Sequence, residues 1–297
     1  MALRDFGVLV LVCLLWASNN IVSKYAVSHL GAPPLFYAAL RFGVVALAVF
    51  PWLFPMPRPR WRLIVVALLM GGGNFALLFL GLKTATPSAA AVVSQLGVPI
   101  TTLLSVMMLG ERIRWRRALG IALTMAGALA VMWDPHGFAL STGLMFVVGS
   151  AATGSLGAVM MKQMDGVKPL QFQAWVGLAS FVPLLGLSAL FESGQVRAGL
   201  DAGWPFLAAV VYSGLVVSVG AHTLYYALVQ RYEANLISPL TLMTPLATIA
   251  LGVALLGDPF GPRMAIGTAV ALAGVLIIAL RPNQVAPLLL AIRNRAQ

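Results

Sequence analysis

His222 and Tyr225 are the side chains best suited to chemistry, because they lie deep in an apolar stretch of the sequence. They are three residues apart, so on a helix they share one face, with Tyr226 close by. An imidazole can bind a carboxylate, stack on an aromatic ligand or exchange a proton near neutral pH. The alternative is a neutral histidine hydrogen-bonded to a neighbouring helix, beside tyrosines that only pack.

Uncharged polar side chains interrupt several other apolar stretches. They cluster beside Trp16, where Asn19 and Asn20 are consecutive and cannot both easily avoid the interior of a bundle. The rest of this set is Ser18, Ser23, Asn74, Ser94, Gln95, Thr101, Thr241 and Thr244. Polar groups in a membrane segment favour the bundle interior or a wet cavity, so the set predicts a neutral, hydrogen-bonding cavity. The alternative role is interhelical hydrogen bonding, worth about 0.6 kcal/mol per bond on average.

Basic residues near the ends of apolar stretches are a third candidate group. Lys24, Arg41 and Lys83 lie near predicted outer ends, where long basic side chains commonly snorkel to the interface. Arg41 is the best candidate to meet a substrate carboxylate, because it lies about two turns beyond Pro33-Pro34, where its helix should begin. The candidate substrate-binding residues are therefore Trp16, Asn19, Asn20, Arg41, Asn74, Gln95, His222 and Tyr225.

Acidic residues are absent from the middle of every apolar stretch. All eight lie at predicted ends or in loops. Proton- and cation-coupled carriers often keep a carboxylate within the membrane. We therefore expect facilitated diffusion, or coupling through His222 or a boundary acid. Glu111 is better explained as the neutraliser of the arginines that follow it.

Signatures of enzymes and metal sites are missing from the sequence. It contains no Gly-x-x-x-x-Gly-Lys-Ser/Thr loop, no His-Glu-x-x-His and no Gly-x-Ser-x-Gly. Its one cysteine, Cys13, lies in the first apolar stretch, so we expect a small core residue and no internal disulfide. The sequence therefore predicts no catalytic residue, no metal and no cofactor.

The composition requires a membrane protein. The chain of 297 residues is 60% hydrophobic and 9% charged with a mean hydropathy of +0.94, whereas soluble domains are about 25% charged. A spanning helix needs roughly 20 apolar residues, and the length leaves room for about ten. The predicted spans are 5–28, 34–54, 62–82, 86–109, 115–133, 139–162, 169–190, 204–229, 234–256 and 262–280.

The basic residues indicate the orientation of the chain. With the N-terminus inside, most of them fall in cytoplasmic loops, and the outer loops hold only Arg197 and Arg263. This positive-inside bias predicts that both termini are cytoplasmic. It also accounts for the net charge of +11 without a nucleic-acid partner.

The sequence contains one long stretch twice. A shift of 147 positions lays Thr101–Met132 on Thr248–Ala279. The identical pairs include Leu109/Leu256, Gly110/Gly257, Arg116/Arg263, Gly120/Gly267, Ala126/Ala273 and Gly127/Gly274. The second copy lacks three of the four arginines that follow Glu111, which suits the opposite side of the membrane. We therefore predict a 5+5 inverted repeat: one half at 1–134, a second at 135–282, and a cytoplasmic tail at 283–297.

Helix-breaking residues recur at corresponding places of the two halves. Gly97 and Pro99 lie in the fourth predicted span, and Pro239 and Pro245 lie in the ninth. Because proline removes a backbone donor and clashes with the preceding turn, we expect hinged helices that line a pathway. The alternative is that proline and glycine are simply common in membrane helices.

Several motifs resemble the EamA-type domain of the drug/metabolite transporter superfamily. They are Gly81–Thr84, Ser94–Pro99, the Leu109-Gly110-Glu111-Arg112 corner and Gly120–Val131, with weaker matches at Leu15–Asn19 and Leu40–Phe42. The second half departs from the family pattern at Asp258-Pro259, where Glu-Arg is usual. The resemblance implies an all-α bundle of ten transmembrane helices in the bacterial inner membrane.

The resemblance also implies export of amino acids, other metabolites or drugs. We expect a carrier of small metabolites, foremost amino acids including aromatic ones, that works by alternating access within the lipid bilayer. A multidrug or lipophilic-cation exporter is the alternative, and a membrane-embedded lipid-modifying enzyme is disfavoured by the scattered charges. The sequence leaves the oligomeric state open and is compatible with a monomer.

Overall fold

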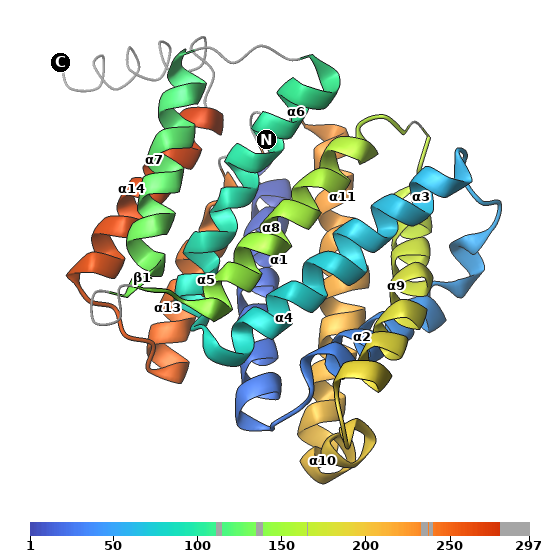
Figure 1. The fold of residues 1–297 in the computed structure, drawn as a ribbon. Coiled ribbons are helices and arrows are strands. Elements are labelled where there is room, and N and C mark those ends of the chain that lie inside the picture. The colour runs from blue at the N-terminus through green and yellow to red at the C-terminus, as the bar shows by residue number, and fades with distance from the viewer. Residues whose placement is uncertain (111–114, 135–138, 165, 233–236, 238–239, 280–297) are drawn as a thin grey trace.

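The computed structural model describes residues 1–110, 115–134, 139–164, 166–232, 237 and 240–279, and these form a bundle of helices (Figure 1). The helical elements as far as residue 132 are α1 (Leu3–Lys24), η1 (Tyr25–His29), α2 (Pro34–Ala48), η2 (Phe50–Leu53), α3 (Arg60–Ala67), η3 (Leu68–Gly73), α4 (Asn74–Thr84), α5 (Pro87–Val93), η4 (Ser94–Leu96), α6 (Gly97–Leu109) and α7 (Trp115–Met132). Those that follow are α8 (Thr142–Met161), α9 (Pro169–Phe191), α10 (Gln195–Val211), η5 (Tyr212–Ala221), α11 (His222–Arg231), α13 (Met243–Leu256) and α14 (Pro262–Ala279).

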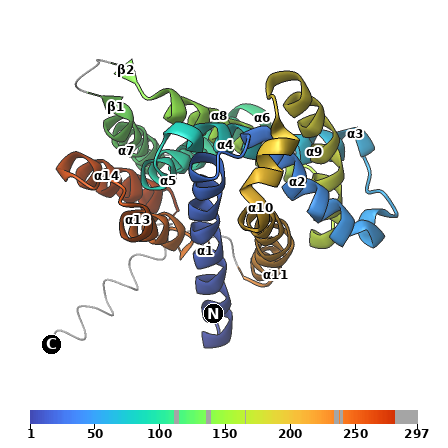
Figure 2. The same ribbon diagram turned by 90° about the horizontal axis from the view of Figure 1, so that it is seen from below.

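Many of these helices have the length and composition of membrane spans. Seven described segments are long and apolar enough to cross a bilayer: Leu3–His29, Arg60–Thr84, Pro87–Leu109, Thr142–Met161, Pro169–Phe191, Gln195–Leu228 and Pro262–Ala279. Two shorter apolar helices, α2 and α13, pack among them. Seen from below, α1 lies between a group containing α5, α7, α13 and α14 and a group containing α2, α9, α10 and α11 (Figure 2).

Proline and glycine set the helix ends where the sequence predicts breaks. Pro34, Pro87 and Pro169 occupy the first turn of α2, α5 and α9, where a missing backbone N–H is tolerated. Gly110 and Gly257 end α6 and α13 in the left-handed conformation, each with φ of +67°. A side chain would be strained at this φ, so the duplicated Leu-Gly corner has a backbone reason for its glycine.

The repeated glycines bring α7 and α14 into close contact. A Cβ atom added to Gly120 would meet the backbone of Gly274, and one added to Gly127 would meet the backbone of Gly267. The shift of 147 maps Gly120 onto Gly267 and Gly127 onto Gly274. The contact between Gly120 and Gly274 is therefore equivalent to the contact between Gly267 and Gly127. Because lipid provides no hydrophobic drive between helices, such small residues permit the backbone approach that membrane helices use for packing.

Three predicted boundaries are corrected by the structure. The second span is predicted to end at 54, but α2 ends at Ala48 and is followed by the 3-10 turn η2. The predicted outer loop before the eighth span is helical, because α10 begins at Gln195 and turns sharply at Gly203, whose φ is +64°. The predicted start of the sixth span is too early. Residues 139 and 140 instead form strand β2 (Ala139–Leu140), which pairs antiparallel with β1 (Trp133–Asp134), and α8 starts at Thr142.

Candidate functional site

A cavity of about 760 Å³ lies among helices from both ends of the sequence. Its described lining comes from α1, α2, α4, η4, α6, α8, η5, α11 and residues just beyond the end of α8 and between α11 and α13. Seven of the eight candidate residues line it: Trp16, Asn19, Asn20, Arg41, Asn74, His222 and Tyr225. The fold therefore brings into one place residues that lie up to 209 positions apart in the sequence (Trp16 to Tyr225).

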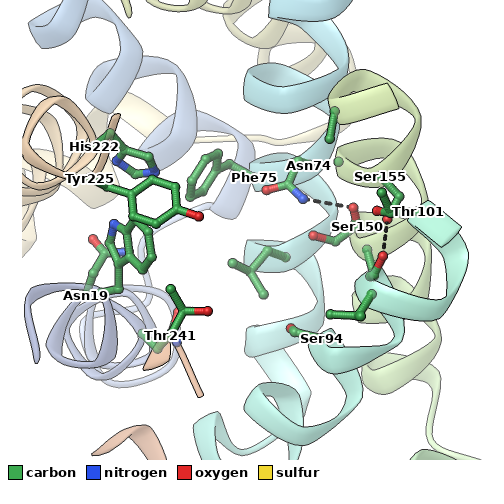
Figure 3. A pocket seen from close by; sticks show the side chains of 18 of the residues that line it. Asn19, Asn74, Phe75, Ser94, Thr101, Ser150, Ser155, His222, Tyr225 and Thr241 are labelled. Carbon is green, nitrogen blue, oxygen red and sulfur yellow. Dashed lines mark hydrogen bonds between the residues drawn. The ribbon is translucent and has the colours of Figure 1, made fainter. Parts of the chain in front are cut away.

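An aromatic wall forms one side of the cavity. The Trp16 ring lies edge-on to Tyr225 with centroids 4.9 Å apart, and it lies 5.3 Å from the His222 ring. Figure 3 shows His222, Tyr225, Asn19 and Thr241 on this side, across from a second group of polar residues. Such a surface can pack against a flat apolar body and still present polar atoms at its edges.

The orientation of His222 is fixed by its own helix. Its Nδ1 donates to the carbonyl of Val217 over 2.9 Å, because a carbonyl oxygen can only accept. In the neutral ring this leaves Nε2 as a hydrogen-bond acceptor. Val217 lies in η5, a π-helix of ten residues. Wide turns of this kind are frequent at functional sites.

A polar wall forms the opposite side. The Asn74 amide donates to the Ser150 carbonyl over 2.8 Å, and the Ser155 hydroxyl donates to the Gly97 carbonyl over 2.8 Å (Figure 3). These bonds connect α4, α6 and α8 and fix the side chains that make them. Phe75 lies between the two walls in the same view.

Asn19 brings a free acceptor to the cavity. Its side chain is buried at 4% exposure, and its Oδ1 has no hydrogen-bond partner among the described residues. Asn20 is the better satisfied of the two amides, since its Nδ2 lies 3.4 Å from the Thr248 hydroxyl. A buried acceptor without a partner is costly, so a ligand N–H or a water molecule at Oδ1 is expected.

Arg41 is the most deeply buried charge in the described structure. Its side chain has 0% exposure, and its Nε donates to the Ser218 hydroxyl over 3.0 Å. That hydroxyl donates in turn to the Ser213 carbonyl over 3.0 Å. The guanidinium carbon lies 4.0 Å from the centre of the Phe75 ring, a cation–π contact. Arg41 does not snorkel to an outer interface.

Other candidate residues lie apart from the cavity lining. The Gln95 amide lies 3.4 Å from the carbonyl of Ala91, one turn earlier in α5. The Ser18 hydroxyl shares a hydrogen bond of 2.6 Å with Tyr212, and the Ser23 hydroxyl lies 3.4 Å from that of Tyr37. These two serines connect helices, which is the alternative role that polar groups in membranes fill.

The expected hinge positions coincide with local breaks in two helices. A single turn of 3-10 helix at Ser94–Leu96 separates α5 from α6, which begins at Gly97 and contains the buried Pro99. In the second copy α13 begins at Met243 and contains Pro245, directly after a turn at Thr241 and Leu242. Ser94 and Thr241, related by the shift of 147, both line the cavity. Pro239 lies outside the described residues.

Several lining residues were not anticipated from the sequence. They are Phe75, Leu78, Val98, Thr102, Ser150, Ala151, Gly154, Ser155, Ala158, Lys162, Val217 and Ile237. Ser150, Gly154 and Ala158 are spaced by four, so a stripe of small residues on the sixth predicted span was the available signal.

The described lining is positive in charge. Arg41 and Lys162 are its only charged members, and no aspartate or glutamate is among the lining residues that the structure describes. In the described parts of the chain no group of three or more histidine, cysteine or acidic side chains is placed to hold a metal ion.

Comparisons with known proteins agree with one another. The sequence profile of the EamA-like transporter family matches residues 6–133 and again residues 141–280. A probable amino-acid metabolite efflux pump of Salmonella typhimurium is 27% identical over 93% of this chain and 95% of its own. The protein of the same description in Escherichia coli is 25% identical over the same shares, 93% and 95%. A probable terminal-alkyne amino-acid exporter of Streptantibioticus cattleyicolor is 27% identical over 91% of both chains.

A solved crystal structure shares the fold. Its TM-score is 0.64 at 20% identity, and the match covers 93% of this chain and 96% of the other. At 20% sequence identity, this similarity shows a shared fold and nothing further.

Proposed function

The chain belongs to the EamA-like transporter family, and from this premise we propose that it exports small metabolites, foremost amino acids including aromatic ones, across the bacterial inner membrane by alternating access. As a member it is a multi-pass membrane protein that exports metabolites, not an enzyme. The relatives named above as efflux pumps or exporters of amino-acid metabolites and amino acids support the substrate class.

The cavity is the observation that carries this proposal. It combines a wall of Trp16, His222 and Tyr225 with amides and hydroxyls on the facing side. An aromatic or aliphatic side chain would pack on the first wall, and the polar end of an amino acid would meet Arg41 and the polar groups of the facing side. Trp16, Asn19, Asn20, Arg41, Asn74, His222 and Tyr225 are the proposed binding residues.

The proposed transport cycle uses an inverted repeat of ten spans, five in each half, with both termini in the cytoplasm. The helix contacts support it, because exchanging the two halves maps one contact onto another. In the exchange, spans one to five take the places of spans six to ten. The contact of α4 (third span) with α8 (sixth span) then corresponds to the contact of α1 (first span) with η5 and α11 (eighth span). The contact of α1 with α13 (ninth span) corresponds to that of α8 with α6 (fourth span). Two similar halves around a shared cavity suit rocking between an inward-open and an outward-open state.

Gly97, Pro99 and Pro245 are the proposed hinge residues within the described part of the chain. Each lies within one turn of a helix break that borders the cavity. The described lining lacks carboxylates, and two modes of transport are compatible with it. One is facilitated diffusion, and the other is transport coupled to proton exchange through His222. An imposed proton gradient distinguishes them, because only the second mode would use it.

An efflux assay in cells tests the proposed function. Cells that overproduce the protein and are loaded with labelled phenylalanine should lose the label faster than cells that carry the empty vector. Overproduction of the Trp16→Ala variant at equal membrane abundance should restore the slow rate. Equal efflux from all three strains, for every amino acid tried, would reject amino-acid export and favour the exporter of lipophilic cations.

A further inference from the structure

Arg41 carries a charge that nothing in the described structure neutralises. Its Nη1 and Nη2 atoms are buried without a hydrogen-bond partner among the described residues. Ser218 satisfies only Nε, which leaves the forked end of the guanidinium unused. This forked end is the part that matches two oxygens of a carboxylate.

The surroundings of Arg41 only partly offset the cost of its burial. Its guanidinium carbon lies 4.0 Å from the Phe75 ring centre and 5.8 Å from those of Phe42 and Phe79. Cation–π contacts replace a fraction of the lost hydration, but a buried charge without a counter-ion remains strongly unfavourable. An anion that enters the cavity and reaches Arg41 would remove that cost.

The rest of the lining offers no corresponding site for a cation. No carboxylate is present in its described part, and the second charged member, Lys162, is also basic. The buried acceptor without a partner is the Asn19 Oδ1, a neutral oxygen, and the Nε2 of a neutral His222 is a second neutral acceptor. Each can accept from an amide N–H as well as from an ammonium group, so the described lining holds no full negative charge to pair with a cation.

We propose that the carrier recognises its substrates as organic carboxylate anions, through Nη1 and Nη2 of Arg41, and that a free ammonium group is not required. The substrate class then extends beyond amino acids to N-acylated amino acids and to aryl-alkyl carboxylates without an amino group. Phe75, which stacks on the guanidinium and lines the same cavity, positions this charge and shields it when no substrate is bound. This inference rests on the proposed function, since it names the chemical class that the same cavity takes.

A panel of ligands with one phenyl body tests the proposal on the purified protein. The probes are phenylalanine, N-acetylphenylalanine, 3-phenylpropionate, phenylalaninamide and 2-phenylethylamine, and the readout is the midpoint of thermal unfolding in detergent. A ligand that binds the folded state raises this midpoint. We expect the three carboxylates to act at concentrations within about threefold of one another, and the amide and the amine to need about tenfold more or to have no effect.

The opposite ranking would overturn the proposal. Stabilisation by 2-phenylethylamine or phenylalaninamide equal to that by phenylalanine would show that the carboxylate is not the recognised group. Failure of N-acetylphenylalanine and 3-phenylpropionate beside a response to phenylalanine would show that the ammonium is required. Absence of a shift with any of the three carboxylates would show that the carboxylate is not the recognised group. The readout needs no transport, so a stabilised protein that does not transport phenylalanine would reject the proposed function and keep the binding inference.

Variants of Arg41 separate recognition from folding. In Arg41→Gln the preference for N-acetylphenylalanine over phenylalaninamide should fall by about tenfold, whereas Arg41→Lys should keep part of it. Arg197→Gln is the matched control, because Arg197 is an exposed cation paired with Asp201 at 3.7 Å and does not line the cavity. An unchanged preference in Arg41→Gln would contradict the proposal. If that variant does not fold, the ligand panel on the unmodified protein still decides.

Discussion

The carboxylate of Asp258 accepts two hydrogen bonds from Ser88, one from its backbone N–H over 2.9 Å and one from its hydroxyl over 2.5 Å. Ser88 lies in the first turn of α5, and Asp258 directly follows the left-handed Gly257 that ends α13. The pair therefore connects the start of the segment Pro87–Leu109, which contains α5 and α6, to the end of α13, the counterpart of α6 in the duplicated sequence. A buried carboxylate that takes up a free N–H at a helix start stabilises both the helix and the contact.

Replacing Asp258 with Asn should lower the stability of the protein. The substitution removes the charge that strengthens both bonds to Ser88, and we expect a loss of about 1–2 kcal/mol. Chemical unfolding in detergent, followed by circular dichroism, measures it. Asp201→Asn is the matched control, because Asp201 is exposed and makes only a surface ion pair. Equal stability of the two variants would show that the charge of Asp258 adds nothing to the contact.

Replacing Gly127 with Ala should separate α7 from α14. A Cβ at this position would overlap the backbone N of Ala271 and the carbonyl O of Gly267, so both helices must shift. We expect a destabilisation of about 1–3 kcal/mol, typical of overpacking. Gly186→Ala in α9 is the control, since no atom lies within 4 Å of the added Cβ. A helix usually gains from this exchange, so the control should be neutral or slightly stabilised.

Replacing His222 with Phe should keep the aromatic contact with Trp16 and lose the polar atoms. We expect transport to fall by about tenfold, equivalent to one lost hydrogen bond to a substrate, while membrane insertion is unchanged. His222→Ala should insert equally well and transport no better than the Phe variant. The initial rate per inserted protein, measured by counterflow, is the relevant quantity. Normal transport by the Phe variant would remove the imidazole nitrogens from the site, and normal transport by both would remove the residue.

The proposed orientation can be tested with single cysteines, because Cys13 is the only native one. In a Cys13→Ala background, Ala2→Cys should be protected from a membrane-impermeant maleimide in intact cells, and Ser193→Cys should react. Both positions are exposed in the structure, so protection would report the membrane and not burial. The reverse pattern would place the N-terminus outside and invert the proposed topology.

The sequence predicted the family, the membrane helices and eleven of the 23 described residues that line the cavity. The resemblance to EamA-type transporters is confirmed by matches over both halves. The candidate residues that reached the cavity share a physical reason, since a polar group in an apolar helix must find an interior place. That rule predicts which residues face the interior, but it does not predict whether they contact a neighbouring helix or line an open cavity. The Ser18 hydroxyl, for example, hydrogen-bonds to the Tyr212 hydroxyl on a neighbouring helix.

Other features needed the three-dimensional packing. Phe75 looks like any apolar residue in the sequence, and its importance comes from its stacking on Arg41. The sequence offered Arg41 as a substrate-binding candidate beside the default of snorkelling, but its complete burial between Ser218 and Phe75 comes from the packing. The β1–β2 pairing and the early start of α10 lie where polar residues interrupt the apolar stretches, and hydropathy does not distinguish a strand or a helix from a loop at these places.

Counterflow of labelled phenylalanine in liposomes that contain only the purified protein is the most direct test of the central claim, that this cavity exports amino acids. Liposomes loaded with unlabelled phenylalanine should take up the label at an initial rate that saturates as the external phenylalanine concentration rises. Liposomes that contain the Trp16→Ala variant should take up far less label at equal protein content. Absence of counterflow for phenylalanine and every other amino acid, with a folded and inserted protein, would contradict the claim.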